Sequence, residues 1–138
     1  MKKIYVAHAD DHNLFIRGVK TVLKPFEEIE IVITANNGKE LLIALEKSIY
    51  IDIVLLDIQM PILDGIALLP ILRENYPKIK IIMLTMHNDL SIIKKCQDYG
   101  VAGYLTKNAS VSDIVLAIVA VMEGQFFFPD TLRIDYLY

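Results

Sequence analysis

Apolar residues come in short runs along the chain, and between these runs apolar positions recur every three or four residues. Runs rich in Ile, Val and Leu, with little polar alternation, are typical of parallel strands buried on both faces. The spacing between the runs predicts helices that pack across such a sheet. The strand-like runs are residues 4–9, 29–34, 53–56, 79–84 and 103–106, and the helical stretches are residues 13–24, 39–47, 65–75, 90–99 and one that starts near 110–113.

Five strands alternating with five helices predict a doubly wound α/β fold, because each parallel crossover needs a helix lying across a face of the sheet. We expect the flavodoxin-like (βα)5 arrangement, a parallel five-stranded sheet in the order 2-1-3-4-5. Pro70 conflicts with its helix, since it removes a backbone donor and should cause a kink. Ser110 to Asp113 has the pattern of a capping box, and Gly124 is placed to end the last helix.

Four of the predicted strands end in residues that can do chemistry. The first strand is followed by Asp10 and Asp11, the third by Asp57, the fourth by Thr85 and the fifth by Lys107. Parallel sheets bind ligands at the carboxyl ends of their strands, and the expected order makes the first and third strands neighbours. Three carboxylates should therefore share one crevice, where Mg²⁺ would offset their repulsion. The alternative is that Asp10 and Asp11 only cap the first helix.

An acid pair, a lone acid, a hydroxyl and a lysine form a set suited to phosphoryl transfer, in which a carboxylate can itself accept the phosphoryl group. The nucleotide-binding patterns GxxxxGK[ST] and GxGxxG do not occur in the sequence. The histidines His8, His12 and His87 match no metal-ligand spacing, so we do not expect them to bind metal.

Length and composition indicate one domain. A chain of 138 residues suits a single core, and no apolar stretch approaches the roughly 20 residues needed to span a bilayer. The apolar stretch after the basic N-terminus is interrupted too soon for a secretory signal, so we expect a cytoplasmic protein without membrane contact. The net charge of −3 disfavours direct nucleic-acid binding, and the single Cys96 can form no internal disulfide.

Four short motifs occur in a specific order. They are Ala9-Asp10-Asp11-His12, Leu56-Asp57-Ile58-Gln59-Met60-Pro61 with Asp64-Gly65, Leu84-Thr85-Met86-His87, and Gly103-Tyr104-Leu105-Thr106-Lys107. Each motif alone is weak, but the set is specific. In this order the motifs resemble the receiver domain of two-component response regulators of the NarL/FixJ (LuxR-type) family, over about residues 3–129.

The resemblance implies that a sensor histidine kinase phosphorylates Asp57 and that Lys107 pairs with the phosphoryl group. It also implies a Mg²⁺ ion bound by Asp11, Asp57 and the backbone carbonyl of Gln59, with Asp10 acting through water.

The resemblance further implies a switch formed by two residues. Thr85 would move to hydrogen-bond the phosphoryl group, and Tyr104 would turn inward as Thr85 moves. The alternative for Tyr104 is an ordinary half-buried strand residue with a hydrated hydroxyl.

We expect residues 1–124 to form the receiver domain and residues 125–138 to form a tail or the start of a linker. The segment from Gly124 to Pro129 resembles the end of such receivers, just before a helix-turn-helix DNA-binding domain that this sequence lacks. Any contact with DNA would go through that absent domain. The aromatic tail is either a linker stub packed loosely on the domain, which we favour, or a surface for a homodimer.

The leading function is a phosphorylation-controlled switch with a transcriptional output. The alternative is a stand-alone receiver that acts in a phosphorelay or as a protein-binding adaptor. A phosphatase is disfavoured, because such enzymes carry a second acid two residues after the nucleophile, where this chain has Gln59. We therefore expect no enzyme, only a domain that assists its own phosphorylation and dephosphorylation.

Overall fold

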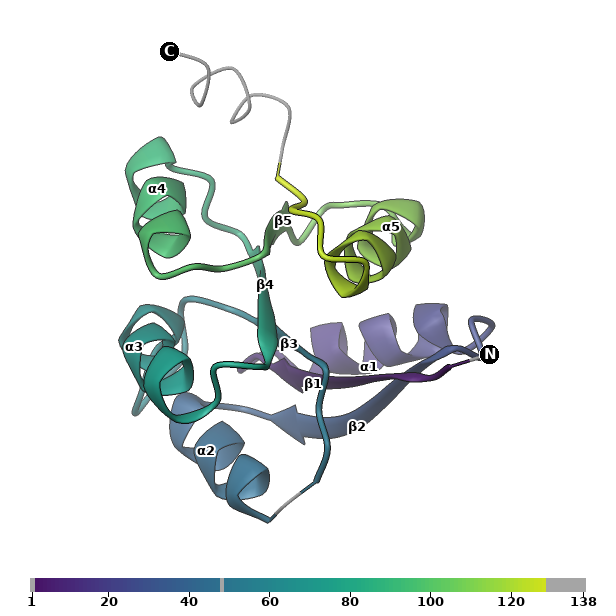
Figure 1. Ribbon diagram of the computed structural model, residues 1–138, viewed down its shortest axis with the longest axis horizontal. Coiled ribbons are helices and arrows are strands. Elements are labelled where there is room, and N and C mark those ends of the chain that lie inside the picture. Colours follow the sequence, from purple (N-terminus) through teal and green to yellow (C-terminus); the bar gives the residue numbers. More distant parts are fainter. Residues whose placement is uncertain (1, 48, 129–138) are drawn as a thin grey trace.

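The computed structural model describes residues 2–47 and 49–128, in which five parallel strands alternate with five helices (Figure 1). The sheet has the order β2-β1-β3-β4-β5, which confirms the predicted fold. The strands are β1 (Ile4–Ala9), β2 (Ile29–Ala35), β3 (Ile53–Leu56), β4 (Lys80–Thr85) and β5 (Gly103–Thr106). The helices are α1 (Asn13–Leu23), α2 (Gly38–Glu46), α3 (Gly65–Asn75), α4 (Leu90–Asp98) and α5 (Val111–Met122).

The ends of these elements lie within one residue of the predicted positions. The predicted cap of α5 is confirmed, because the Ser110 hydroxyl accepts a hydrogen bond from the Asp113 N–H at 3.1 Å. Gly124 has a φ of 85°, the left-handed conformation expected of a residue that ends a helix. Helix α3 continues through Pro70, and its buried leucines pack it against the sheet.

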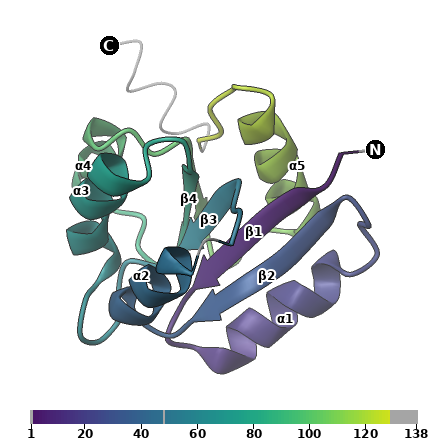
Figure 2. The same ribbon diagram turned by 60° about the horizontal axis from the view of Figure 1, so that its bottom comes forward.

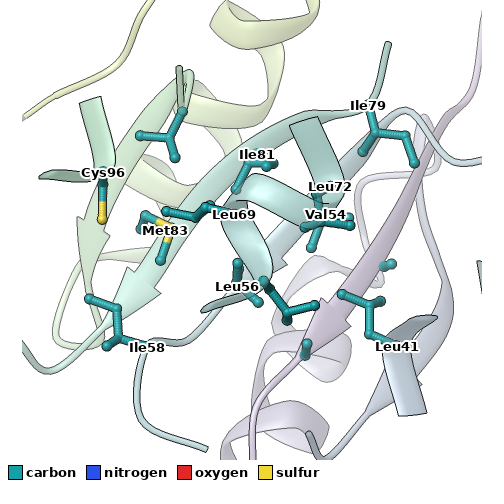
Figure 3. Close-up of a cluster of buried hydrophobic side chains, with 14 of the residues drawn as sticks. Leu41, Val54, Leu56, Ile58, Leu69, Leu72, Ile79, Ile81, Met83 and Cys96 are labelled. Atoms are coloured by element: carbon teal, nitrogen blue, oxygen red, sulfur yellow. The ribbon is translucent and has the colours of Figure 1, made fainter. Parts of the chain in front are cut away.

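Two hydrophobic cores lie on opposite faces of the sheet, beneath the helices that Figure 2 shows on either side of it. Helices α2, α3 and α4 cover one face and helices α1 and α5 cover the other. Figure 3 shows the first core, where Val54 and Leu56 of β3 pack with Leu69 and Leu72 of α3. All four residues of β3 are buried, which explains why this strand reads as a continuous apolar run.

The register of the sheet brings the strand ends together. Ala9 pairs with Leu56, and the Asp57 N–H donates to the Ala9 carbonyl at 3.0 Å. At the ends of β4 and β5, in the other half of the sheet, the Lys107 N–H donates to the Thr85 carbonyl at 2.9 Å. The residues that follow β1, β3, β4 and β5 therefore share one edge.

The segment after α5 adds to the outer edge of β5. The Phe127 N–H donates to the Ala102 carbonyl at 2.9 Å, and the Tyr104 N–H donates to the Phe127 carbonyl at 2.9 Å. Phe128 is 6% exposed and belongs to the same core as Tyr104, whereas Phe126 is 69% exposed. Residues 129–138 lie outside the described residues, so the expected role of the tail stays a prediction. Nowhere in the described part of the chain is there a helix with the length and apolarity to cross a membrane.

Candidate functional site

Asp57 follows β3 directly and is 2% exposed. Its Oδ1 accepts a hydrogen bond from the Ile58 N–H at 2.8 Å. Its Oδ2 lies 2.9 Å from Nζ of Lys107. Each oxygen of this buried carboxylate thus has a partner, which the cost of burying a charge requires.

The first residue of α3 fixes the loop after Asp57. The Gly65 N–H donates to the Ile58 carbonyl at 2.8 Å, and a Cβ on Gly65 would lie 2.2 Å from the Asp57 carbonyl oxygen. No side chain fits there, because the obstacle is main chain. Asp64 caps the helix by accepting from the Ala67 N–H at 2.8 Å. The Asp64-Gly65 motif therefore positions the loop that carries Asp57.

Lys107 connects two buried carboxylates. Its Nζ lies 2.8 Å from Oδ2 of Asp10 and 2.9 Å from Oδ2 of Asp57, and its side chain is 8% exposed. Burial lowers the pKa of Lys107, but the hydrogen bonds to Asp10 and Asp57 outweigh this effect and raise the pKa overall. The ammonium group is therefore charged at neutral pH and lies next to any group that Asp57 acquires.

Asp10 is the buried member of the acid pair. Its burial raises the pKa of the carboxyl group, and its hydrogen bonds with Lys107 and His12 oppose this rise. Oδ1 of Asp10 accepts from the His12 N–H at 2.9 Å, and His12 precedes the first turn of α1. Helix capping therefore does not describe Asp10, whose other oxygen is committed to Lys107.

The acidic residues form a possible cation site. One ligand atom each from Asp10, Asp11, His12 and Asp57 lie within 4.8 Å of one another. Asp11 is partly exposed and provides an open side, while Asp10 and Asp57 are buried. Three carboxylates face a single ammonium group, so negative charge is in excess. Oxygen donors of this kind suit Mg²⁺, and the residues present therefore fit the predicted ion.

Two other predicted residues meet at the backbone of His87, in the loop after β4. Oγ1 of the buried Thr85 accepts a long hydrogen bond from the His87 N–H at 3.4 Å. Tyr104 is completely buried, and its hydroxyl donates to the His87 carbonyl at 2.7 Å. Burial also raises the pKa of Tyr104. The alternative of a half-buried tyrosine with a hydrated hydroxyl is wrong, because the ring lies inside the core that α4 covers.

Gln59 lies on the rim of the site. Its side chain is exposed, and Oε1 lies 3.3 Å from Nε2 of His87. This contact joins the loop after β3 to the loop after β4.

The sequence pattern does not predict the positions of two histidines. Nδ1 of His12 lies 3.2 Å from Oδ1 of both Asp10 and Asp11 and 3.0 Å from Nζ of Lys107. The signal that could have revealed the contacts of His12 is its place directly after the acid pair, at the start of a helix. His8 is buried in β1, 4.0 Å from Asp10, and its burial lowers the pKa of the imidazole to about 4. The imidazole next to Asp10 is therefore neutral at pH 7.

Comparisons with known proteins show the family of this chain. The sequence pattern of the Response regulator receiver domain matches residues 6–119, and the chain belongs to this family. Transcriptional regulatory protein LnrK of Bacillus subtilis (strain 168) is 33% identical over 136 residues, which are 97% of this chain and 60% of LnrK. Response regulator UvrY of Escherichia coli (strain K12) is 33% identical over 122 residues, which are 88% of this chain and 56% of UvrY.

The solved structures include a close match to the whole fold. The isolated REC domain of RcsB from Salmonella enterica serovar Typhimurium, determined with the phosphomimetic BeF3⁻, superposes with a TM-score of 0.87 at 27% identity. The match covers 96% of this chain and 97% of that domain. The chain is thus a receiver domain of the kind found in two-component transcriptional regulators, a class that histidine kinases phosphorylate. It spans about 60% of the length of LnrK.

Proposed function

We propose that Asp57 is the phosphoacceptor and that a sensor histidine kinase supplies the phosphoryl group. The observation that carries this proposal is the 2.9 Å contact between Lys107 and Asp57, which places a buried positive charge beside an oriented carboxylate. One carboxylate oxygen of Asp57 attacks the phosphorus of a phosphohistidine. The P–N bond breaks, the kinase imidazole leaves with the electron pair, and an acyl phosphate forms on Asp57.

Lys107 and the acid pair then accommodate the added charge. The phosphoryl group brings extra negative charge into a pocket that already holds three carboxylates, and Lys107 pairs with it. Asp11, Asp57 and the backbone carbonyl of Gln59 would hold a Mg²⁺ ion, with Asp10 acting through water. When bound, the ion neutralises charge on the phosphoryl oxygens. The excess of acidic groups within 4.8 Å of one another supports this assignment.

We further propose that Thr85 and Tyr104 form the switch. A phosphoryl group on Asp57 offers strong acceptors to the Thr85 hydroxyl, whose present contact with the His87 N–H is long and weak. The Tyr104 hydroxyl donates to the carbonyl of His87, the residue whose N–H contacts Thr85. A movement of Thr85 therefore changes the loop that Tyr104 anchors. The ring of Tyr104 is already inward in this structure.

The output of the whole protein is also a proposal, since the chain spans about 60% of LnrK. RcsB has been solved as dimers bound to DNA. By analogy, we propose that a DNA-binding domain follows this receiver, that a homodimer binds the DNA, and that phosphorylation controls transcription in the cytoplasm.

Intact-mass spectrometry after incubation with acetyl phosphate and Mg²⁺ tests the phosphoacceptor. Wild-type protein should gain one phosphoryl group, and Asp57→Asn should gain none. Asp64→Asn is the matched control, because Asn keeps the helix cap outside the pocket and should leave the yield unchanged. An adduct of equal yield on Asp57→Asn would refute the assignment.

A further inference from the structure

A histidine lies against the carboxylates of the proposed cation site. Nδ1 of His12 is 3.2 Å from Oδ1 of Asp10 and 3.2 Å from Oδ1 of Asp11, and its side chain is 64% exposed. With Asp57, these residues form the group whose ligand atoms lie within 4.8 Å of one another. The group therefore offers a nitrogen donor in addition to its oxygen donors.

The neighbours of this nitrogen carry opposite charges. Nδ1 of His12 lies near two carboxylate oxygens and also 3.0 Å from Nζ of Lys107. A ring nitrogen carries either a proton or a lone pair. With a proton, Nδ1 can donate to a carboxylate, but its N–H faces the Lys107 ammonium unfavourably. With a lone pair, Nδ1 can accept from Lys107, but the lone pair faces the carboxylate oxygens unfavourably. A cation bound to the nitrogen and to Asp11 would use the lone pair and offset the carboxylate charge, with Asp10 reached through water, and Lys107 would keep its contacts with Asp10 and Asp57.

The distances suit a shared metal ion. Carboxylate oxygens and imidazole nitrogens bind divalent metal ions at about 2.1 Å, so two ligands at a right angle lie about 3.0 Å apart. The 3.2 Å separation between Nδ1 of His12 and Oδ1 of Asp11 is close to this value. Binding would leave Oδ2 of Asp10 on Lys107, because that contact uses the other carboxylate oxygen.

We propose that His12 is an additional ligand of the cation site, and that the site therefore binds a divalent transition-metal ion more tightly than Mg²⁺. This inference rests on the cation site of the proposed function. Mg²⁺ prefers oxygen ligands and keeps several waters, whereas imidazole nitrogen suits ions such as Fe²⁺, Co²⁺, Ni²⁺ and Zn²⁺. A ligand set that mixes nitrogen and oxygen therefore stabilises these ions through the His12 nitrogen, which would add little to the binding of Mg²⁺.

Calorimetric titration of the full chain with Co²⁺ and with Mg²⁺ tests the proposal, together with the visible spectrum of bound Co²⁺. We expect wild-type protein to bind Co²⁺ at least about tenfold more tightly than Mg²⁺. His12→Phe, which keeps a ring without a nitrogen donor, should weaken Co²⁺ binding about tenfold or more, shift the Co²⁺ absorption and change Mg²⁺ binding less than about twofold. Tyr50→Phe is the control and should change neither affinity, because Tyr50 is exposed and contacts Asp52 at the opposite end of β3 from the site.

Three results would overturn the ligand role of His12: no tighter binding of Co²⁺ than of Mg²⁺, unchanged Co²⁺ binding by His12→Phe, or equal losses for both ions. A failure of the proposed function looks different. If Asp11→Asn bound Mg²⁺ with wild-type affinity, the cation site itself would be wrong, whatever His12→Phe shows.

Discussion

Replacing Lys107 by Met should destabilise the domain strongly, because it leaves two buried carboxylates without their shared partner. Nζ of Lys107 lies 2.8 Å from Asp10 and 2.9 Å from Asp57, and each contact is worth about 6 kcal/mol at an effective dielectric constant of about 20. The variant also avoids the free-energy cost of burying the ammonium group, which offsets part of this loss. We expect a net loss of about 3–5 kcal/mol at pH 7, the usual range when one partner of a buried ion pair is removed.

Urea unfolding at pH 7 measures this loss, with Asp10→Asn and the double variant completing a cycle. Asn at position 10 still accepts from the His12 N–H but carries no charge. Lys107→Met should therefore cost clearly less in the Asp10→Asn background, with a coupling above about 1 kcal/mol. Lower pH should also reduce the loss, because Asp10, whose pKa burial raises, can then take up a proton. A loss below about 1 kcal/mol, or equal losses in both backgrounds, would refute this reasoning.

Three further predictions concern the framework of the site. Gly65→Ala should destabilise the domain by about 3 kcal/mol or more in urea unfolding, since its Cβ would lie 2.2 Å from a main-chain oxygen. Gly18→Ala is the control, because its Cβ would meet nothing within 4 Å, and it should be neutral or stabilising. Phe128→Ala should cost about 3–4 kcal/mol and the exposed Phe126→Ala less than about 1 kcal/mol, and equal losses would contradict the packing of this segment. Burial raises the pKa of Cys96 to about 11, so its thiol should resist a disulfide reagent at pH 8 unless the domain unfolds. The stability that Cys96 adds relative to Cys96→Ala should be lost as pH rises from about 9 to 11, because the unfolded chain then loses the thiol proton more readily than the folded domain.

The fold could be predicted from the sequence because local patterns and tertiary packing agree. Strand β3 is buried on both faces and is apolar throughout, so its run of Ile, Val and Leu has a single interpretation. The same agreement placed Asp57 and Lys107 at one edge, since strand order alone decides which strand ends are neighbours. Pro70 is the exception, because packing of the neighbouring leucines maintains α3 against a local preference.

Side-chain orientation is what the sequence could not provide. His12 has no spacing that marks a metal ligand, and only the turn between β1 and α1 brings its ring beside Asp10 and Asp11. The burial of Tyr104 depends on the loop after β4, whose carbonyl at His87 receives the hydroxyl. The contacts of His12 depend on a local turn and that of Tyr104 joins separate segments, so neither leaves a periodic signal in the sequence.

The central claim is that Asp57 accepts the phosphoryl group, and chemical trapping tests it most directly. Borohydride reduces an acyl phosphate to an alcohol, which converts a phosphorylated aspartate into homoserine. Protein treated with acetyl phosphate and Mg²⁺, reduced and digested should yield a peptide with homoserine at position 57 and aspartate at positions 10 and 11. Homoserine at Asp10 or Asp11, or no homoserine in protein that carries a phosphoryl group by mass, would contradict the account.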